Sequence, residues 1–188
     1  MMQELERLKL LDNTIIVFTS DHGYWYGEHG LNEERRLAYE EAIRIPLLVR
    51  YPPKVQQGSK PDNMVLSIDL AQTLVQLAGE ALTDKFQGRS LVPIFENSVE
   101  NWRSSILIEY YSDTVFKRMK SMGYKAVRND RYKYIHYVDL TQADELYDLQ
   151  EDPFELKNRI NDTAFAETLV QMKALLNEQL KQTGAQPI

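Results

Sequence analysis

A short apolar run, residues 15–20, stops abruptly at Asp21 and His22 and restricts the folds open to this chain. The run is almost entirely β-branched and aromatic, which is typical of a strand that is covered on both faces. Leucines at helical spacing in residues 2–11 come directly before it. A helix that leads straight into a buried strand predicts an α/β fold.

Two further elements extend this α/β pattern. A second short apolar run, residues 45–51, predicts another strand, and residues 68–79 carry the leucine stripe of a helix. Ser67 or Asp69 is placed to cap that helix, and Gly79 is placed to end it.

The pattern changes at about residue 100. An amphipathic helix is predicted over residues 163–182, preceded by four short strand candidates at 104–111, 124–130, 132–138 and 144–149. Strands in series followed by one helix predict a small antiparallel sheet with a helix across it. We therefore predict two domains, an α/β domain over 1–100 and a small α+β domain over 101–188.

Composition excludes several classes of protein. The 188 residues carry a formal net charge of −6 and contain no cysteine. An acidic chain lacks the basic field that nucleic acid or an anionic membrane surface requires, so neither partner is expected. No stretch approaches the roughly 20 apolar residues of a membrane span. The absence of cysteine excludes disulfides, thiolate metal sites and a cysteine nucleophile within this chain.

Asp21 and His22 stand where the first predicted strand ends, and ligands of α/β sheets collect at the carboxyl ends of strands. A carboxylate beside an imidazole can bind a metal ion or act as an acid/base pair. Gly23 would allow a tight turn or the close approach of a ligand. The alternative is that Asp21 forms a turn and His22 is merely solvated.

Several elements follow in a fixed order within residues 19–52: Asp-His-Gly, then Gly-Glu-His-Gly-Leu, then Tyr-Glu, then Arg-x-Pro. In this order they resemble the second metal-binding segment of the type I sulfatases, in the alkaline phosphatase superfamily. The resemblance continues to the end of the chain, where segments at 68–79, 86–95, 126–137 and 145–158 look like the carboxy-terminal portion of bacterial sulfatases that act on sulfated sugars.

This resemblance implies the carboxy-terminal part of an alkaline phosphatase-like fold, with half of a metal site in residues 1–100. It also implies hydrolysis of sulfate esters, on a sulfated carbohydrate. Asp21 and His22 would be two ligands of a divalent cation, usually calcium, which holds a sulfate oxygen. Calcium prefers oxygen ligands, so the imidazole leaves magnesium, manganese and zinc open.

Arg35 stands four residues before Tyr39, where the family usually has a lysine that contacts the sulfate. Arginine keeps the positive charge but gives up no proton, so it would bind sulfate without acting as a general acid. The alternative is a solvated face in which Arg35 pairs with Glu33 or Glu40. By the same resemblance, His29 is either a substrate contact or only a neighbour of the site.

The nucleophile of the family has no counterpart here. Family members convert a Cys or Ser in a Cys/Ser-x-Pro-x-Arg motif to formylglycine, and this chain lacks the motif. The resemblance therefore implies a fragment that is inactive alone, with formylglycine expected only in an amino-terminal part. A sheet without its first strands would expose apolar surface, which predicts low solubility or a homodimer that covers it. Family members often work in the periplasm or outside the cell, and any signal would lie upstream.

Two other functions stay open. Phosphodiesterases and phosphonate monoester hydrolases of the same superfamily also use Asp-His metal sites at strand ends. A module that is not an enzyme could instead bind sulfated glycans through the metal-bearing loop. The sequence leaves the sugar, the sulfate position, the metal and the compartment undetermined.

Overall fold

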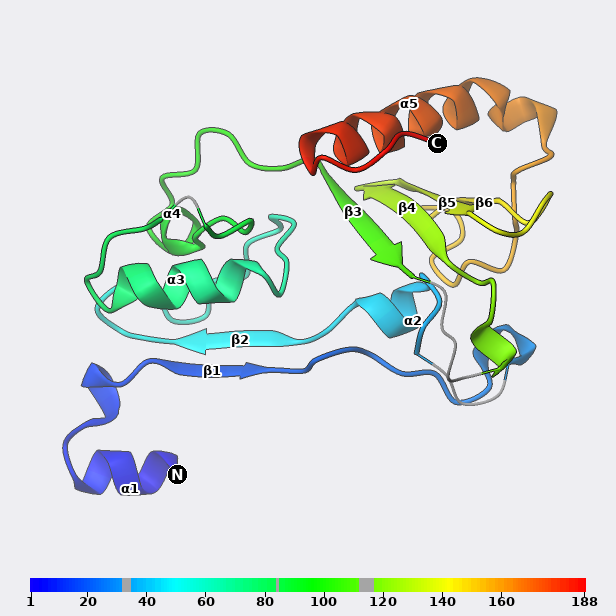
Figure 1. Cartoon of the computed structure of the whole chain (residues 1–188). Helices are drawn as coiled ribbons and strands as arrows, with labels where there is room; N and C mark the ends of the chain where they lie inside the picture. Colours follow the sequence, from blue (N-terminus) through cyan, green and yellow to red (C-terminus); the bar gives the residue numbers. More distant parts are fainter. Residues whose placement is uncertain (32–34, 84, 112–116) are drawn as a thin grey trace. The chain divides into compact units, whose positions relative to one another are not determined.

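The structure of the chain, a computed structural model, describes residues 1–31, 35–83, 85–111 and 117–188. Its contacts divide it into two compact units (Figure 1): Met1–Asp21 with Ile45–Arg103, and His22–Arg44 with Ser104–Ile188. The helices are α1 (Met2–Arg7), α2 (Glu40–Ile43), α3 (Asp69–Leu77), α4 (Val92–Phe95) and α5 (Ala166–Gln182). The strands are β1 (Ile16–Thr19), β2 (Leu47–Arg50), β3 (Ser105–Tyr110), β4 (Tyr124–Asn129), β5 (Tyr132–Tyr137) and β6 (Glu145–Asp148). Short 3-10 helices lie at Leu11–Asn13, Glu28–Gly30, Lys117–Met119 and Thr163–Phe165.

In the first unit, β1 and β2 form a two-stranded antiparallel pair in which Phe18 lies opposite Leu48. Opposite residues of paired strands point to the same face. Phe18 is 61% exposed and Leu48 is 66% exposed, so the described residues leave this face uncovered. The predicted strands are present, but the expectation that the first strand is covered on both faces is wrong for this face.

The predicted cap of α3 is wrong, because Ile68 stands at its N-cap position and makes no side-chain cap. Asp69 is instead completely buried. Its carboxylate accepts hydrogen bonds from the backbone N–H groups of Leu66 (2.7 Å) and Arg89 (2.8 Å), and from the Arg103 guanidinium (2.8 Å). Asp69 therefore ties three segments of the first unit together.

The second unit is built on the predicted small antiparallel sheet, which has four strands in the order β3-β4-β5-β6. Successive residues of a strand point to opposite faces, so each strand contributes to two cores. The core under α5 contains Val127, Tyr134, Leu146, Met172, Leu176 and Leu180. The core on the other face contains Trp25, Leu37, Ala38, Ala42, Met119, Tyr124, Ala126, Ile135, Tyr137 and Tyr147. The predicted apolar stripe of α5 is confirmed by the first of these cores.

The described residues of the segment His22–Arg44 cover one face of this sheet, although they lie far from the sheet in sequence. Trp25, Ala38 and Ala42 are buried there against side chains of β4, β5 and β6. Figure 1 shows α5 on one side of the sheet and α2 on the other. Both faces of the sheet are therefore covered. Within the described ranges, no helix is long and apolar enough to cross a membrane.

Candidate functional site

The predicted metal ligands stand at the boundary between the two units: Asp21 closes the first unit and His22 opens the second. Asp21 is exposed just after β1, and the Ser20 hydroxyl donates to its Oδ1 at 3.3 Å. His22 is half-buried. The joint action of the two residues on a metal ion stays a prediction.

The imidazole of His22 has a defined tautomer. Its Nδ1 lies 2.6 Å from the carbonyl oxygen of Gly23. A carbonyl can only accept, so Nδ1 carries the proton, and in the neutral ring Nε2 has the lone pair, which suits a metal ligand held by an outer hydrogen bond. In the described ranges no three His, Asp or Glu side chains gather to hold a metal ion. The donor set of Asp21 and His22 fits a divalent cation, but zinc or calcium needs at least two further ligands.

The packing of Gly23 against the backbone of α2 requires a glycine at this position. Its N–H donates to the carbonyl oxygen of Ala42 at 2.7 Å. A Cβ at this position would lie 2.0 Å from the carbonyl oxygen of Glu41 and 3.0 Å from that of Arg44. The close approach expected at Gly23 is therefore made by the backbone at the end of α2, which fixes the residue that follows His22.

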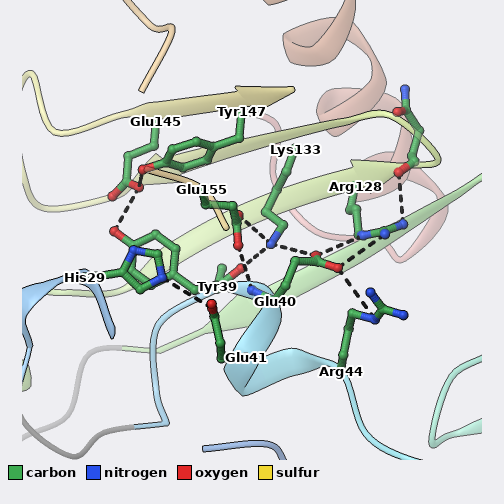
Figure 2. Close-up of polar contacts among 12 residues, drawn as sticks. His29, Tyr39, Glu40, Glu41, Arg44, Arg128, Lys133, Glu145, Tyr147 and Glu155 are labelled. Carbon is green, nitrogen blue, oxygen red and sulfur yellow. Dashed lines mark hydrogen bonds and ion pairs between the residues drawn. The ribbon is translucent and has the colours of Figure 1, made fainter. Parts of the chain in front are cut away.

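His29 lies inside the second unit, and its side chain is only 8% exposed. Its ring stacks on Tyr39 at 3.9 Å between centroids, and its Nε2 lies 3.3 Å from Glu41 Oε2 (Figure 2). The backbone of His29 has φ +59°, an uncommon conformation for a residue other than glycine. A substrate contact by His29 stays a prediction, and in this structure the ring is engaged with Tyr39 and Glu41.

Arg35 is exposed, as a residue that meets substrate or solvent would be. Glu33, its suggested partner, lies outside the described residues. Glu40, the other suggested partner, is 8% exposed and contacts Arg44, Arg128 and Lys133. The role of Arg35 in binding sulfate stays a prediction.

Sequence reasoning missed a group of buried charges, here called the Lys133 network: Glu40, Arg128, Lys133 and Glu155 (Figure 2). The Lys133 ammonium donates to the carbonyl oxygen of Ala38 at 2.7 Å and lies 2.8 Å from Glu40 Oε1 and 2.7 Å from Glu155 Oε1. Arg128 Nε donates to Glu40 Oε1 at 3.0 Å. The network joins β4 and β5 to the start of α2.

The two carboxylates of the Lys133 network have pKa values shifted in opposite directions. Burial raises the pKa of Glu155, and Lys133 offsets this only in part. Burial also acts to raise the pKa of Glu40, but Lys133 and Arg128 together outweigh it, so the pKa lies below its ordinary value. Glu40, whose charge is stabilised by Lys133 and Arg128, is therefore the more firmly ionised of the two.

A second buried polar group surrounds Glu145, whose carboxylate accepts hydrogen bonds from the hydroxyls of Tyr39 (3.1 Å), Tyr137 (2.9 Å) and Tyr147 (2.5 Å). Burial raises the pKa of each tyrosine above its ordinary range, and the Glu145 charge adds to the shift. The three phenols therefore stay protonated and act as donors.

One signal in the sequence could have indicated the Lys133 network. Lys133 alternates with Ile135 and Tyr137, so a lysine occupies an inward position of a strand.

The four-stranded antiparallel sheet with its carboxy-terminal helix matches the carboxy-terminal portion of sulfatases of the alkaline phosphatase superfamily. The chain belongs to the family described as N-sulphoglucosamine sulphohydrolase, C-terminal, whose model matches residues 27–182.

Similar proteins agree with this assignment. The chain is 34% identical over 185 residues to an N-acetylglucosamine-6-O-sulfatase of Bacteroides thetaiotaomicron, covering 97% of this chain and 33% of that protein. It matches a solved structure of a protein in complex with its substrate, D-glucosamine-2-N,6-O-disulfate, with TM-score 0.90 and 33% identity over 99% of this chain and 38% of that one. A phosphonate monoester hydrolase of Agrobacterium radiobacter matches with TM-score 0.76 and 27% identity over 93% and 38%. The chain spans about a third of the length of the first of these, the curated relative.

Proposed function

We propose that the protein to which this chain belongs hydrolyses sulfate esters of a sulfated carbohydrate, and that this chain supplies part of its metal and substrate site. The observation that carries the proposal is the match of 99% of the chain, at TM-score 0.90, to a protein bound to a sulfated glucosamine. The chain lacks the Cys/Ser-x-Pro-x-Arg motif, so we expect it to have no turnover by itself.

Asp21 and His22 would hold a divalent cation, calcium in the first instance, through a carboxylate oxygen and the Nε2 of an imidazole whose Nδ1–H is donated to Gly23. When bound, such a cation neutralises charge on the sulfate group and orients it for in-line attack. Arg35 would donate hydrogen bonds to sulfate oxygens, and because a guanidinium is a poor proton donor it would orient the group without protonating the leaving oxygen. His29 would contact the sugar at the edge of the site.

Isothermal titration of the chain with calcium, and then with magnesium, manganese and zinc, measures the metal site. We expect Asp21→Ala to lower the metal affinity by at least about tenfold, the scale of losing a well-held contact around a metal. The matched control is Asp62→Ala, which removes another exposed carboxylate of the first unit. Equal affinities of the wild-type chain and Asp21→Ala would remove Asp21 from the site.

The phosphonate monoester hydrolase match favours a second candidate function, in which the substrate is a phosphorus ester. Metal-dependent binding of D-glucosamine-2-N,6-O-disulfate and of a phenylphosphonate monoester, measured in parallel, separates the two. Tighter binding of the sulfated sugar supports a sulfatase, and the reverse order supports the alternative.

A binding module that is not an enzyme would also bind the sulfated sugar. The gene sequence upstream of the Met1 codon separates this candidate from an enzyme, because a hydrolase requires an in-frame region with the nucleophile motif.

We also propose a homodimer that covers the exposed face of β1 and β2, and a periplasmic or extracellular location. Sedimentation equilibrium that shows a monomer at high concentration would contradict the homodimer.

A further inference from the structure

Lys133 is a charged side chain at an inward position of β5, with no exposed surface. Its ammonium donates to the carbonyl oxygen of Ala38 and lies within ion-pair distance of the carboxylates of Glu40 and Glu155. Two of these three partners belong to the segment that leads into α2. The lysine is therefore committed to one task within the second unit, which is to hold the start of α2 against the sheet (Figure 2).

Helix α2 needs such a contact because it has only four residues. A single helical turn is unstable by itself. Its N-cap residue, Tyr39, makes no side-chain cap. The cap comes instead from Glu155, whose Oε2 accepts the backbone N–H of Glu40 at 2.7 Å. Lys133 holds that carboxylate in place, so the amino end of α2 is fixed from the sheet.

The carboxyl end of α2 in turn fixes Gly23. The Gly23 N–H donates to Ala42, and there is no room for a Cβ between Gly23 and the carbonyl oxygen of Glu41. The carbonyl oxygen of Gly23 accepts the Nδ1–H of His22. An unbroken series of contacts within the second unit therefore runs from Lys133 through α2 to the imidazole of His22.

We propose that Lys133, together with Glu155, is a positioning residue for His22: it sets the orientation and tautomer of the imidazole through α2 and Gly23. The proposal rests on the proposed function, in which His22 is a metal ligand. Lys133 itself touches neither His22 nor a metal ion and acts only through the backbone that it holds.

The chemistry of the Lys133 network favours positioning over simple stabilisation. Buried ion pairs can often be replaced by apolar side chains of similar size without loss of stability, because desolvation offsets the attraction between the charges. Apolar contacts have no preferred direction. Hydrogen bonds to Ala38 and Glu40 fix the direction of the backbone, which packing alone leaves less defined.

The test uses the double variant Lys133→Met/Glu155→Leu, which removes one positive and one negative charge from the core. Glu40 keeps its contacts with Arg128 and Arg44, so no charge of the network is left without a partner. The matched control is Arg131→Met/Asp148→Asn. It removes another ion pair of the same sheet, in which the Arg131 guanidinium donates to the buried Asp148 carboxylate at 2.7 to 3.2 Å. Both residues of this pair lie outside the Lys133 network.

Two measurements read the position of His22 directly. The chain has three histidines, so the ¹⁵N resonances of the His22 ring can be assigned, and they report which nitrogen carries the proton. Amide hydrogen exchange at Gly23 and Glu40 reports whether α2 is held. In the double variant we expect mixed tautomers at His22 and exchange at least about tenfold faster at both amides, with slow exchange kept in β4 and β5. The control variant should leave His22 and both amides unchanged.

A folded double variant with the wild-type tautomer and unchanged exchange at Gly23 would overturn the proposal. If the double variant does not fold, Glu155→Gln takes its place, since it keeps the shape of the side chain and removes the charge that faces Lys133. This variant should produce the same changes at His22 to a smaller extent. A folded Glu155→Gln with no change at His22 or Gly23 would also overturn the proposal.

Metal titration then separates this inference from the proposed function. If His22 is a ligand, the double variant should bind the metal at least about tenfold more weakly than the wild-type chain, whereas the control variant should bind it equally well. If the wild-type chain binds no divalent cation, the metal site of the proposed function fails. The tautomer of His22 and the exchange at Gly23 still decide whether Lys133 positions the imidazole.

Discussion

Each unit of the chain has a fully buried charged residue that holds backbone from other segments: Asp69 in the first and Lys133 in the second. The partners of Asp69 lie 3 to 34 positions away in sequence. Lys133 reaches Ala38, 95 positions away. The carboxylate beside it, Glu155, accepts a backbone N–H 115 positions away. The same kind of contact is local in one unit and long-range in the other.

Because of this difference in sequence separation, the loss of Asp69 and the loss of Lys133 should have different effects on the fold. Asp69 joins segments that already follow one another around α3, so its loss should loosen loops. Lys133 joins a separate segment to a sheet that has its own second core under α5. Its loss should release the segment His22–Arg44 and leave the sheet folded, which is how an active-site segment can be disturbed without unfolding its support.

The largest effect is expected from Lys133→Met. Glu155 would keep a buried carboxylate without a cation in contact, so the second unit should lose about 3–5 kcal/mol of unfolding free energy. Urea unfolding followed by Trp25 fluorescence measures this, in a Trp102→Phe background that leaves one reporter in the second unit. A loss below about 1 kcal/mol would mean that the network contributes little.

Asp69→Asn tests the local counterpart. The amide keeps one acceptor oxygen but loses the charge that faces Arg103, and hydrogen bonds to charged groups contribute about 1.5–3 kcal/mol. We expect a loss of this size in the first unit, measured by Trp102 fluorescence in a Trp25→Phe background. An equal loss in the second unit would contradict the separation of the two units.

Gly23→Ala tests the contact between Gly23 and the carboxyl end of α2 in the second unit. A Cβ 2.0 Å from the carbonyl oxygen of Glu41 forces the backbone apart, and overpacking costs about 1–3 kcal/mol. The thermal unfolding of the second unit should move down accordingly. Ala38→Gly removes a buried methyl group from the same segment without adding atoms and serves as the control.

The sequence was sufficient for elements whose stability is local. The strands around Val127 and Tyr134 and the stripe of α5 follow periods of two and of 3.6 residues, which a sequence displays directly. The helix cap at Asp69 was predicted wrongly, because a carboxylate at a helix start can accept hydrogen bonds either from the helix itself or from other backbone, and Asp69 accepts them from Leu66 and Arg89.

The sequence could predict which residues belong to the candidate site, but not the contacts that hold them. Asp21, His22 and Gly23 are adjacent in sequence, so their pattern was visible, but the contact that explains Gly23 is with α2. The partners of Lys133 were invisible, because a lysine in a strand is usually solvated and no local pattern announces an acceptor 95 positions away. Long-range polar contacts depend on topology, which the strand pattern alone does not give.

A smaller effect, visible as pH dependence, is expected at Asp148. Burial acts to raise the pKa of its carboxyl, but the hydrogen bonds from Arg131 and from the N–H groups of Glu151 and Gln150 outweigh burial, so the pKa is lowered from 3.8. A carboxyl with a lowered pKa in the folded state stabilises the fold above its unfolded pKa, and this contribution is lost as pH falls through the folded pKa. Arg131 is 46% exposed, so solvent screens the pair and its contribution is small. Asp148→Asn should therefore be less stable than the wild-type chain at pH 6, and the difference should shrink as the pH falls below 3.8 and vanish once the pH is below the folded pKa.

The smallest effect on stability is expected from Phe18→Ser, because Phe18 and its partner Leu48 are exposed on the two-stranded pair. Exposed substitutions away from special features change stability by no more than about 0.5 kcal/mol. The same change removes apolar area from the face that the proposed homodimer would cover, so sedimentation equilibrium should show weaker self-association. If Phe18→Ser unfolds in solution, this face of the β1–β2 pair must be covered. The first unit would then no longer differ from the second, whose sheet is covered on both faces.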